Sequence, residues 1–170
     1  FIEKLNRYSY RYAPQQLLAL KFIMLTGMRT GAVVRTKWDW IDRECEGDKA
    51  TIYYPATTTG IKRYKKNYHR DHYVPITKEV RKILEKAKQF STNEYVFSKL
   101  LEGNKDQHLR EERPSKVMTG MGIVNVKGEK VTSHGWRKTL MTAGKTIFGK
   151  DHEMLDRQLG HIPEGKVNQA

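Results

Sequence analysis

Apolar side chains recur at helical spacing in the first part of the chain. After Pro14, the apolar residues of segment 15–26 lie three or four positions apart, as Leu18, Phe22 and Leu25 do. This spacing favours a helix, with Pro14 in its first turn and Gly27 at its end. A short second helix is predicted over 31–36.

β-branched and aromatic residues then predict three short strands. Trp38, Trp40 and Ile41 lead into the first, 50–54 forms the second and 72–76 the third. A long connection over 55–71 joins the last two. We therefore expect a small three-stranded antiparallel sheet.

The rest of the chain predicts helices separated by polar loops. Thr77 fits the N-cap of a helix over 78–90. A short extended piece at 95–97 and a loop over 98–113 follow. Further helices are predicted over 114–122, from about 134 to 147 with Ser133 as the cap, and over 151–159 before Gly160. The order of helix, sheet and several helices predicts one α+β domain over 1–170, mainly helical.

Composition narrows the class of protein. The 170 residues carry 32 Lys and Arg against 19 Asp and Glu, a net charge of +13, which is typical of a nucleic-acid-binding domain. The single cysteine, Cys45, excludes an intrachain disulfide and a cysteine-rich zinc site. No segment approaches the ~20 apolar residues of a membrane span. We expect a soluble cytoplasmic protein.

The positive charge is concentrated in segment 61–70, which contains no acidic residue. Tyrosines and a histidine are interleaved with five basic residues, Lys62, Arg63, Lys65, Lys66 and Arg70. Such a run usually contacts phosphates, although a solvated loop is the plain alternative. We take these residues, together with Lys138, as candidate DNA contacts.

Three short segments carry residues suited to phosphate chemistry. Arg29 follows a glycine turn, His134 and Arg137 are three positions apart on one predicted helical face, and His161 follows Gly160. Each alone is a weak signal. Together, two arginine forks can bind the non-bridging oxygens of one phosphate, and a histidine can transfer a proton near neutral pH. Donors of this kind contribute on the order of 10²–10³ each in rate. No carboxylate cluster for magnesium and no glycine-rich phosphate loop accompanies them, and cations can themselves neutralise the charge.

These segments resemble the signature boxes of the tyrosine recombinases, the phage-integrase family. The first box is similar to 26–29 followed by 37–42, the basic hairpin ends in 72–77, and the later boxes are His134-x-x-Arg137 and 159–161. The similarity runs from about Leu17 to the C-terminus.

The resemblance implies roles for five residues. Arg29 and Arg137 would clamp the scissile phosphate, His134 would exchange a proton with the nucleophile, and His161 would donate to a phosphate oxygen. A hairpin lysine, Lys66 with Lys65 as second choice, would be the general acid. The resemblance also implies double-stranded DNA as the partner, which a tetramer cuts and rejoins through a 3′-phosphotyrosine. It implies no cofactor and a location in a bacterial cell or phage-infected host.

Two positions depart from the family pattern. Ala32 stands where an acidic residue often supports the first arginine. The family tyrosine usually lies about nine or ten residues beyond the last histidine, but no tyrosine follows Tyr95 and the ninth residue after His161 is Ala170. We expect a fragment that stops just before its nucleophile, or a Tyr-to-Ala replacement at 170, in either case unable to form a phosphotyrosyl link. The start reads as mid-chain, so a separate core-binding domain is expected upstream, and a monomer is expected in solution.

Two alternatives remain open at this point. One is a non-catalytic DNA-binding protein on the same fold. The other is a metal-dependent nuclease using His69, His72, His134 and His161, whose positions show no ligand spacing.

Overall fold

A computed structural model describes residues 2–42, 50–61, 70–99, 107–125, 127–149 and 153–160. Its helices are α1 (Ile2–Arg7), α2 (Pro14–Thr26), α3 (Thr30–Val34), α4 (Lys78–Lys88), α5 (Arg113–Gly120), α6 (Ser133–Phe148) and α7 (Glu153–Gln158). Two 3-10 turns are η1 (Ser9–Arg11) and η2 (Trp38–Trp40), and the strands are β1 (Thr51–Tyr54) and β2 (His72–Pro75). The predictions made for Cys45, for Lys62, Arg63, Lys65 and Lys66, and for His69 and His161 lie outside the described residues.

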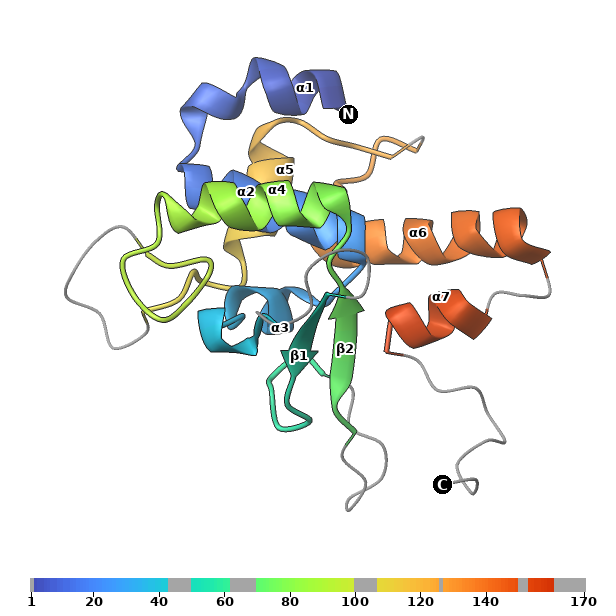
Figure 1. Cartoon of the computed structure of the whole chain (residues 1–170). Helices are drawn as coiled ribbons and strands as arrows, with labels where there is room; N and C mark the ends of the chain where they lie inside the picture. Colours follow the sequence, from blue (N-terminus) through green and yellow to red (C-terminus); the bar gives the residue numbers. More distant parts are fainter. Residues whose placement is uncertain are drawn as a thin grey trace.

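Helix α2 lies at the centre of the domain. It contacts α3, α4, α5 and α6, and Leu20, Phe22 and Ile23 are fully buried. Figure 1 shows α4 running alongside it and α6 extending to one side. One apolar cluster joins α2 to α4 and the strands, and a second joins it to α5 through Val117 and Met118. The predicted bounds of α2, with Pro14 in the first turn and Gly27 as a left-handed C-cap, are confirmed.

The first predicted strand, at Trp38–Ile41, is wrong, and the sheet in the described part of the chain has two antiparallel strands. Trp38–Trp40 form a 3-10 turn, and Ile41 makes one isolated bridge to Ile52. The two indoles anchor this turn to different neighbours. Trp38 Nε1 donates to Ser91 Oγ at 2.9 Å, and Trp40 packs edge-on against Tyr54 at 5.6 Å. Side-chain packing therefore overrides the strand propensity of these residues.

The later helices occur close to their predicted positions. Thr77 caps α4 by accepting from the Val80 N–H at 3.3 Å, as predicted. The predicted cap of α6 is wrong by one residue, because Thr132 Oγ1, rather than Ser133, accepts from the Gly135 N–H at 3.1 Å. Helix α1 was not predicted. None of the described helices combines the length and apolar character that crossing a membrane requires.

Candidate active site

Arg29 is placed by the turn between α2 and α3. Gly27 ends α2 with φ 65°, and its N–H donates to the Ile23 carbonyl at 2.8 Å. Two residues later, Arg29 is the extended N-cap of α3 and is half-buried. Its Nη1 donates to the Gly60 carbonyl at 3.4 Å. The arginine is therefore held between the start of α3 and the loop after β1.

Arg137 is a buried side chain that connects two distant turns. It lies one turn into α6 and is only 5% exposed. Its Nη1 donates to the Gly27 carbonyl and its Nη2 to the Leu159 carbonyl. Burial lowers the pKa of Arg137 to about 10, and the positive charge of Arg29 acts in the same direction. The structure thus brings Arg29 and Arg137 together, and their surroundings disfavour a further positive charge.

Hydroxyl groups fix the start of α6 against α3 and α5. Ser133 Oγ lies 2.8 Å from Thr30 Oγ1 and 2.8 Å from Ser115 Oγ, and the Ser133 N–H donates to Ser115 Oγ at 3.2 Å. Thr30 immediately follows Arg29, and Ser133 precedes His134. This network therefore sets the spacing between the two arginine-bearing segments, a role that the sequence reasoning missed.

Gly60 supplies a backbone acceptor for Arg29 and lies close to Ala32, the position where the family pattern often has an acidic side chain. Ala32 is fully buried, and Gly60 has φ +95°, so a Cβ there would lie 2.5 Å from the Ala32 backbone nitrogen. Glu111, which lies beside Gly31, pairs with Arg35. Arg29 is accordingly supported by a backbone carbonyl, which the sequence reasoning left unresolved.

The remaining predicted residues in the described part of the chain are exposed. They are His134 and Lys138 on α6 and Arg70 before β2. His134 and Arg137 therefore differ sharply in burial despite their three-residue spacing. Lys138 lines an open hollow of ≈ 510 Å³ beside Gly135, together with Lys130. The approach of the hairpin lysines and His161 to the arginines stays a prediction, because these residues lie outside the described ranges.

His72 lies in the same neighbourhood, although its sequence position suggested only a strand. The hypothetical Cβ of Gly160 would lie 3.7 Å from its Nδ1 and Cε1, which places the ring against the turn after α7. Its Nε2 is buried and has no hydrogen-bond partner among the described residues. Burial lowers the pKa of His72, a backbone hydrogen bond to Gln158 raises it, and Arg137, Arg29 and Arg70 lower it further.

The described ranges contain no group of three or more His, Cys, Asp or Glu side chains placed to hold a metal ion.

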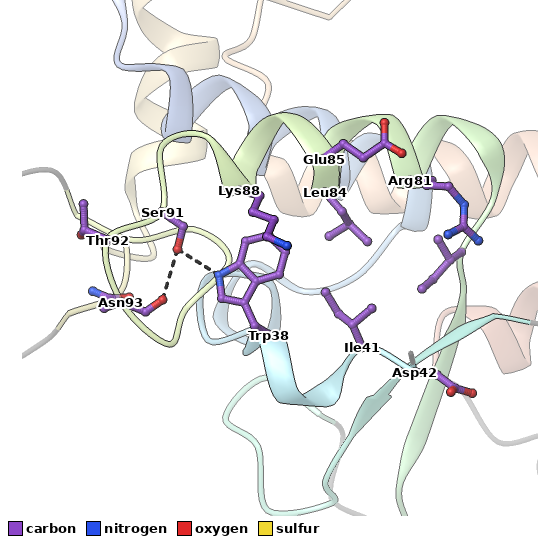
Figure 2. A pocket seen from close by; sticks show the side chains of 11 residues that line it. Trp38, Ile41, Asp42, Arg81, Leu84, Glu85, Lys88, Ser91, Thr92 and Asn93 are labelled. Atoms are coloured by element: carbon purple, nitrogen blue, oxygen red, sulfur yellow. Dashed lines mark hydrogen bonds between the residues drawn. The ribbon is translucent and has the colours of Figure 1, made fainter. Parts of the chain in front are cut away.

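A separate open groove of ≈ 760 Å³ lies between η2 and α4. Figure 2 shows Trp38 and Leu84 on its walls and Asp42, Arg81, Glu85 and Lys88 at its edges. None of the predicted site residues lines this groove.

The chain is similar in sequence to known phage integrases. A profile of the phage integrase family matches residues 2–162. The chain belongs to the phage integrase family. A prophage integrase, IntZ of Escherichia coli (strain K12), is 26% identical over 147 residues, covering 86% of this chain and 32% of the relative. The chain thus spans about a third of that integrase.

Solved structures share the fold of this integrase-family chain. The lambda integrase catalytic core matches with a TM-score of 0.64 at 16% identity, over 93% of this chain and 90% of that one. A lambda integrase tetramer bound to a Holliday junction matches with a TM-score of 0.63 at 16% identity, over 96% of this chain and 44% of that one. The XerH site-specific recombinase bound to difH substrate matches with a TM-score of 0.60 at 16% identity, over 95% and 45% respectively. The mainly helical α+β class is therefore confirmed, with a smaller sheet than predicted.

Proposed function

We propose that this chain is the catalytic domain of a site-specific DNA recombinase, in which Arg29 and Arg137 bind the scissile phosphate of double-stranded DNA. The observation that carries the proposal is the meeting of these two guanidinium groups, which are far apart in the sequence and held by backbone carbonyls of three separate turns. Family membership and the fold shared with DNA-bound recombinases support it.

The electrostatics of the pair suit an anion. Burial and the charge of Arg29 both act against the protonated form of Arg137. A phosphodiester beside the two groups offsets that penalty, and it does so most strongly in the transition state, where charge builds on the non-bridging oxygens. Preorganised arginines of this kind lower the barrier without rearranging during the reaction.

The proposed reaction transfers one phosphoryl group twice. A tyrosine hydroxyl attacks the phosphorus while the exposed His134 accepts the proton of that hydroxyl. The bond from phosphorus to O5′ breaks, and the leaving oxygen takes a proton from the hairpin lysine, proposed as Lys66. His161 is proposed to donate to a phosphate oxygen. A 5′ hydroxyl of a second DNA then reverses the step, so the number of phosphodiester bonds is conserved. We propose assembly with further protomers on DNA for the whole protein.

Duplex binding by the 170-residue chain tests the phosphate clamp. Arg29→Ala and Arg137→Ala are each expected to weaken binding of a short mixed-sequence duplex and to reduce the salt slope by about 1. Lys116→Ala is the control, because it removes one exposed positive charge from α5. Unchanged affinity and salt slope for both arginine variants would contradict the proposed site.

Cleavage separates the recombinase from a non-catalytic DNA-binding protein on the same fold. In a longer chain that carries a tyrosine after His161, we expect a covalent complex with a nicked suicide substrate. Arg137→Ala should abolish that complex while weakening DNA binding only mildly. Cleavage that survives Arg137→Ala would show that the clamp is assigned wrongly, and DNA binding with no cleavage would favour the alternative.

A further inference from the structure

His72 is the first residue of β2, and the role inferred for it rests on the proposed phosphate site. Its strand partner is Tyr54 of β1, and its ring lies against Gly160 in the turn that follows α7. The carbonyl of the preceding Leu159 accepts from Arg137. His72 therefore lies between the start of β2 and the turn after α7, next to the residue whose carbonyl binds the buried arginine.

The two ring nitrogens of His72 have different surroundings. Within the part of the chain that the structure describes, Nε2 is buried without a hydrogen-bond partner, so the backbone hydrogen bond to Gln158 is made by Nδ1. Because a backbone carbonyl accepts that bond, Nδ1 carries the hydrogen in the neutral ring and Nε2 carries the lone pair. A buried nitrogen without a partner is costly unless it gains one in another state of the site.

The charges facing the imidazole come from several elements. They are Arg29 at the start of α3, Arg137 on α6 and Arg70 ahead of β2, while the α7 end contributes the Gln158 backbone. All three guanidinium groups oppose a fourth positive charge nearby. A bound phosphodiester brings negative charge to the same place and reverses this balance.

We propose that His72 is a proton-linked member of the phosphate site, neutral while the site is empty and protonated at Nε2 when a DNA phosphate binds beside Arg29 and Arg137. The proton comes from solvent, and the new Nε2–H donates to a phosphate oxygen. The imidazolium then adds one charge-assisted donor to the arginine pair. DNA binding thus takes up a proton.

The test compares wild type with His72→Asn in binding a short mixed-sequence duplex from about pH 6 to about pH 8. The asparagine amide keeps a donor near the Gln158 backbone and cannot titrate. Wild-type affinity is expected to rise as the pH falls, by up to about tenfold per pH unit for one linked proton, and the curve of His72→Asn should be flatter. His108→Asn is the matched control, because His108 packs against Tyr95 and its Nδ1 donates to the Leu109 carbonyl at 2.8 Å.

NMR of the wild-type histidine rings gives a reading that needs no variant to fold. The pKa of His72 should rise when duplex DNA is added. An unchanged His72 pKa, or equal pH dependence in wild type and His72→Asn, would overturn this proposal while Arg29→Ala and Arg137→Ala still weaken binding. If those arginine variants bind as wild type does, the proposed function itself fails.

Discussion

Replacing Gly60 by alanine tests whether a backbone carbonyl supports Arg29. Gly60 has φ +95°, and an added Cβ would lie 2.5 Å from the Ala32 nitrogen and 3.0 Å from the Gly31 carbonyl carbon. Both neighbours are backbone atoms at the start of α3, so the loop has to move. That movement would carry the Gly60 carbonyl away from Arg29 Nη1, now at 3.4 Å.

Two effects are expected to lower the free energy of unfolding of Gly60→Ala. A side chain in the left-handed region costs about 1–2 kcal/mol, and overlap with packed atoms adds about 1–3 kcal/mol. Gly128→Ala isolates the first of these, because Gly128 has φ +79° and nothing within 4 Å of the added Cβ. The free energy of unfolding should therefore fall by about 2–5 kcal/mol for Gly60→Ala, against about 1–2 kcal/mol for the control.

Urea unfolding followed by circular dichroism measures the stability of the two variants, and fluorescence anisotropy with duplex DNA measures their binding. Only Gly60→Ala should weaken DNA binding, since Gly128 is an exposed turn residue. Equal losses of stability in the two variants would refute the close approach. Unchanged DNA affinity in a folded Gly60→Ala protein would refute the support of Arg29.

Three further outcomes follow from the described contacts. Arg137→Lys keeps the charge but cannot reach both carbonyls, so the free energy of unfolding should fall by about 1.5–3 kcal/mol in urea titrations, and an unchanged midpoint would contradict the two-carbonyl contact. Ser133→Ala should cost about 1–3 kcal/mol in the same assay, because it leaves two hydroxyls without their shared partner, whereas the exposed control Thr142→Ala should cost less. The pKa of His72 is lowered in the folded state, so the unfolded state binds more protons. The contribution of His72 to the free energy of unfolding should therefore be fully present above the ordinary pKa of 6.5 and be lost as the pH falls below it. His72→Asn should lose less stability over that range, and parallel pH curves would contradict the assignment.

Local signals predicted the helices well. Pro14 begins α2, Gly27 ends it, and the Thr77 side chain caps α4. Each of these effects is local, so it can be predicted without knowledge of distant residues. The strand predicted at Trp38–Ile41 is absent because tertiary contacts decide the conformation of Trp38 and Trp40. One indole binds Ser91 beyond α4 and the other packs on β1, and neither contact leaves a trace in the local pattern.

The sequence pointed to Arg29 and Arg137 as candidate site residues, but it did not show which groups hold them. Arg29 and Arg137 lie in short segments whose combination and order, rather than either arginine alone, carry the sequence signal. Their supports are carbonyls of Gly27, Gly60 and Leu159, and every residue of the chain has a carbonyl. The sequence shows that Ala32 is not acidic, but it cannot show that the Gly60 carbonyl accepts a hydrogen bond from Arg29 instead.

The buried guanidinium of Arg137 gives a physical reason why the sequence boxes belong together. Gly27 lies two residues before Arg29, and Leu159 lies two residues before His161. Arg137 donates to both carbonyls, and the Leu159 side chain leaves no room for a Cβ on Gly27, at 2.4 Å. Any displacement of one turn is therefore transmitted to the other through Arg137. Substitutions at Gly27 or Leu159, neither of which offers a side chain to phosphate, should impair the site by moving this arginine.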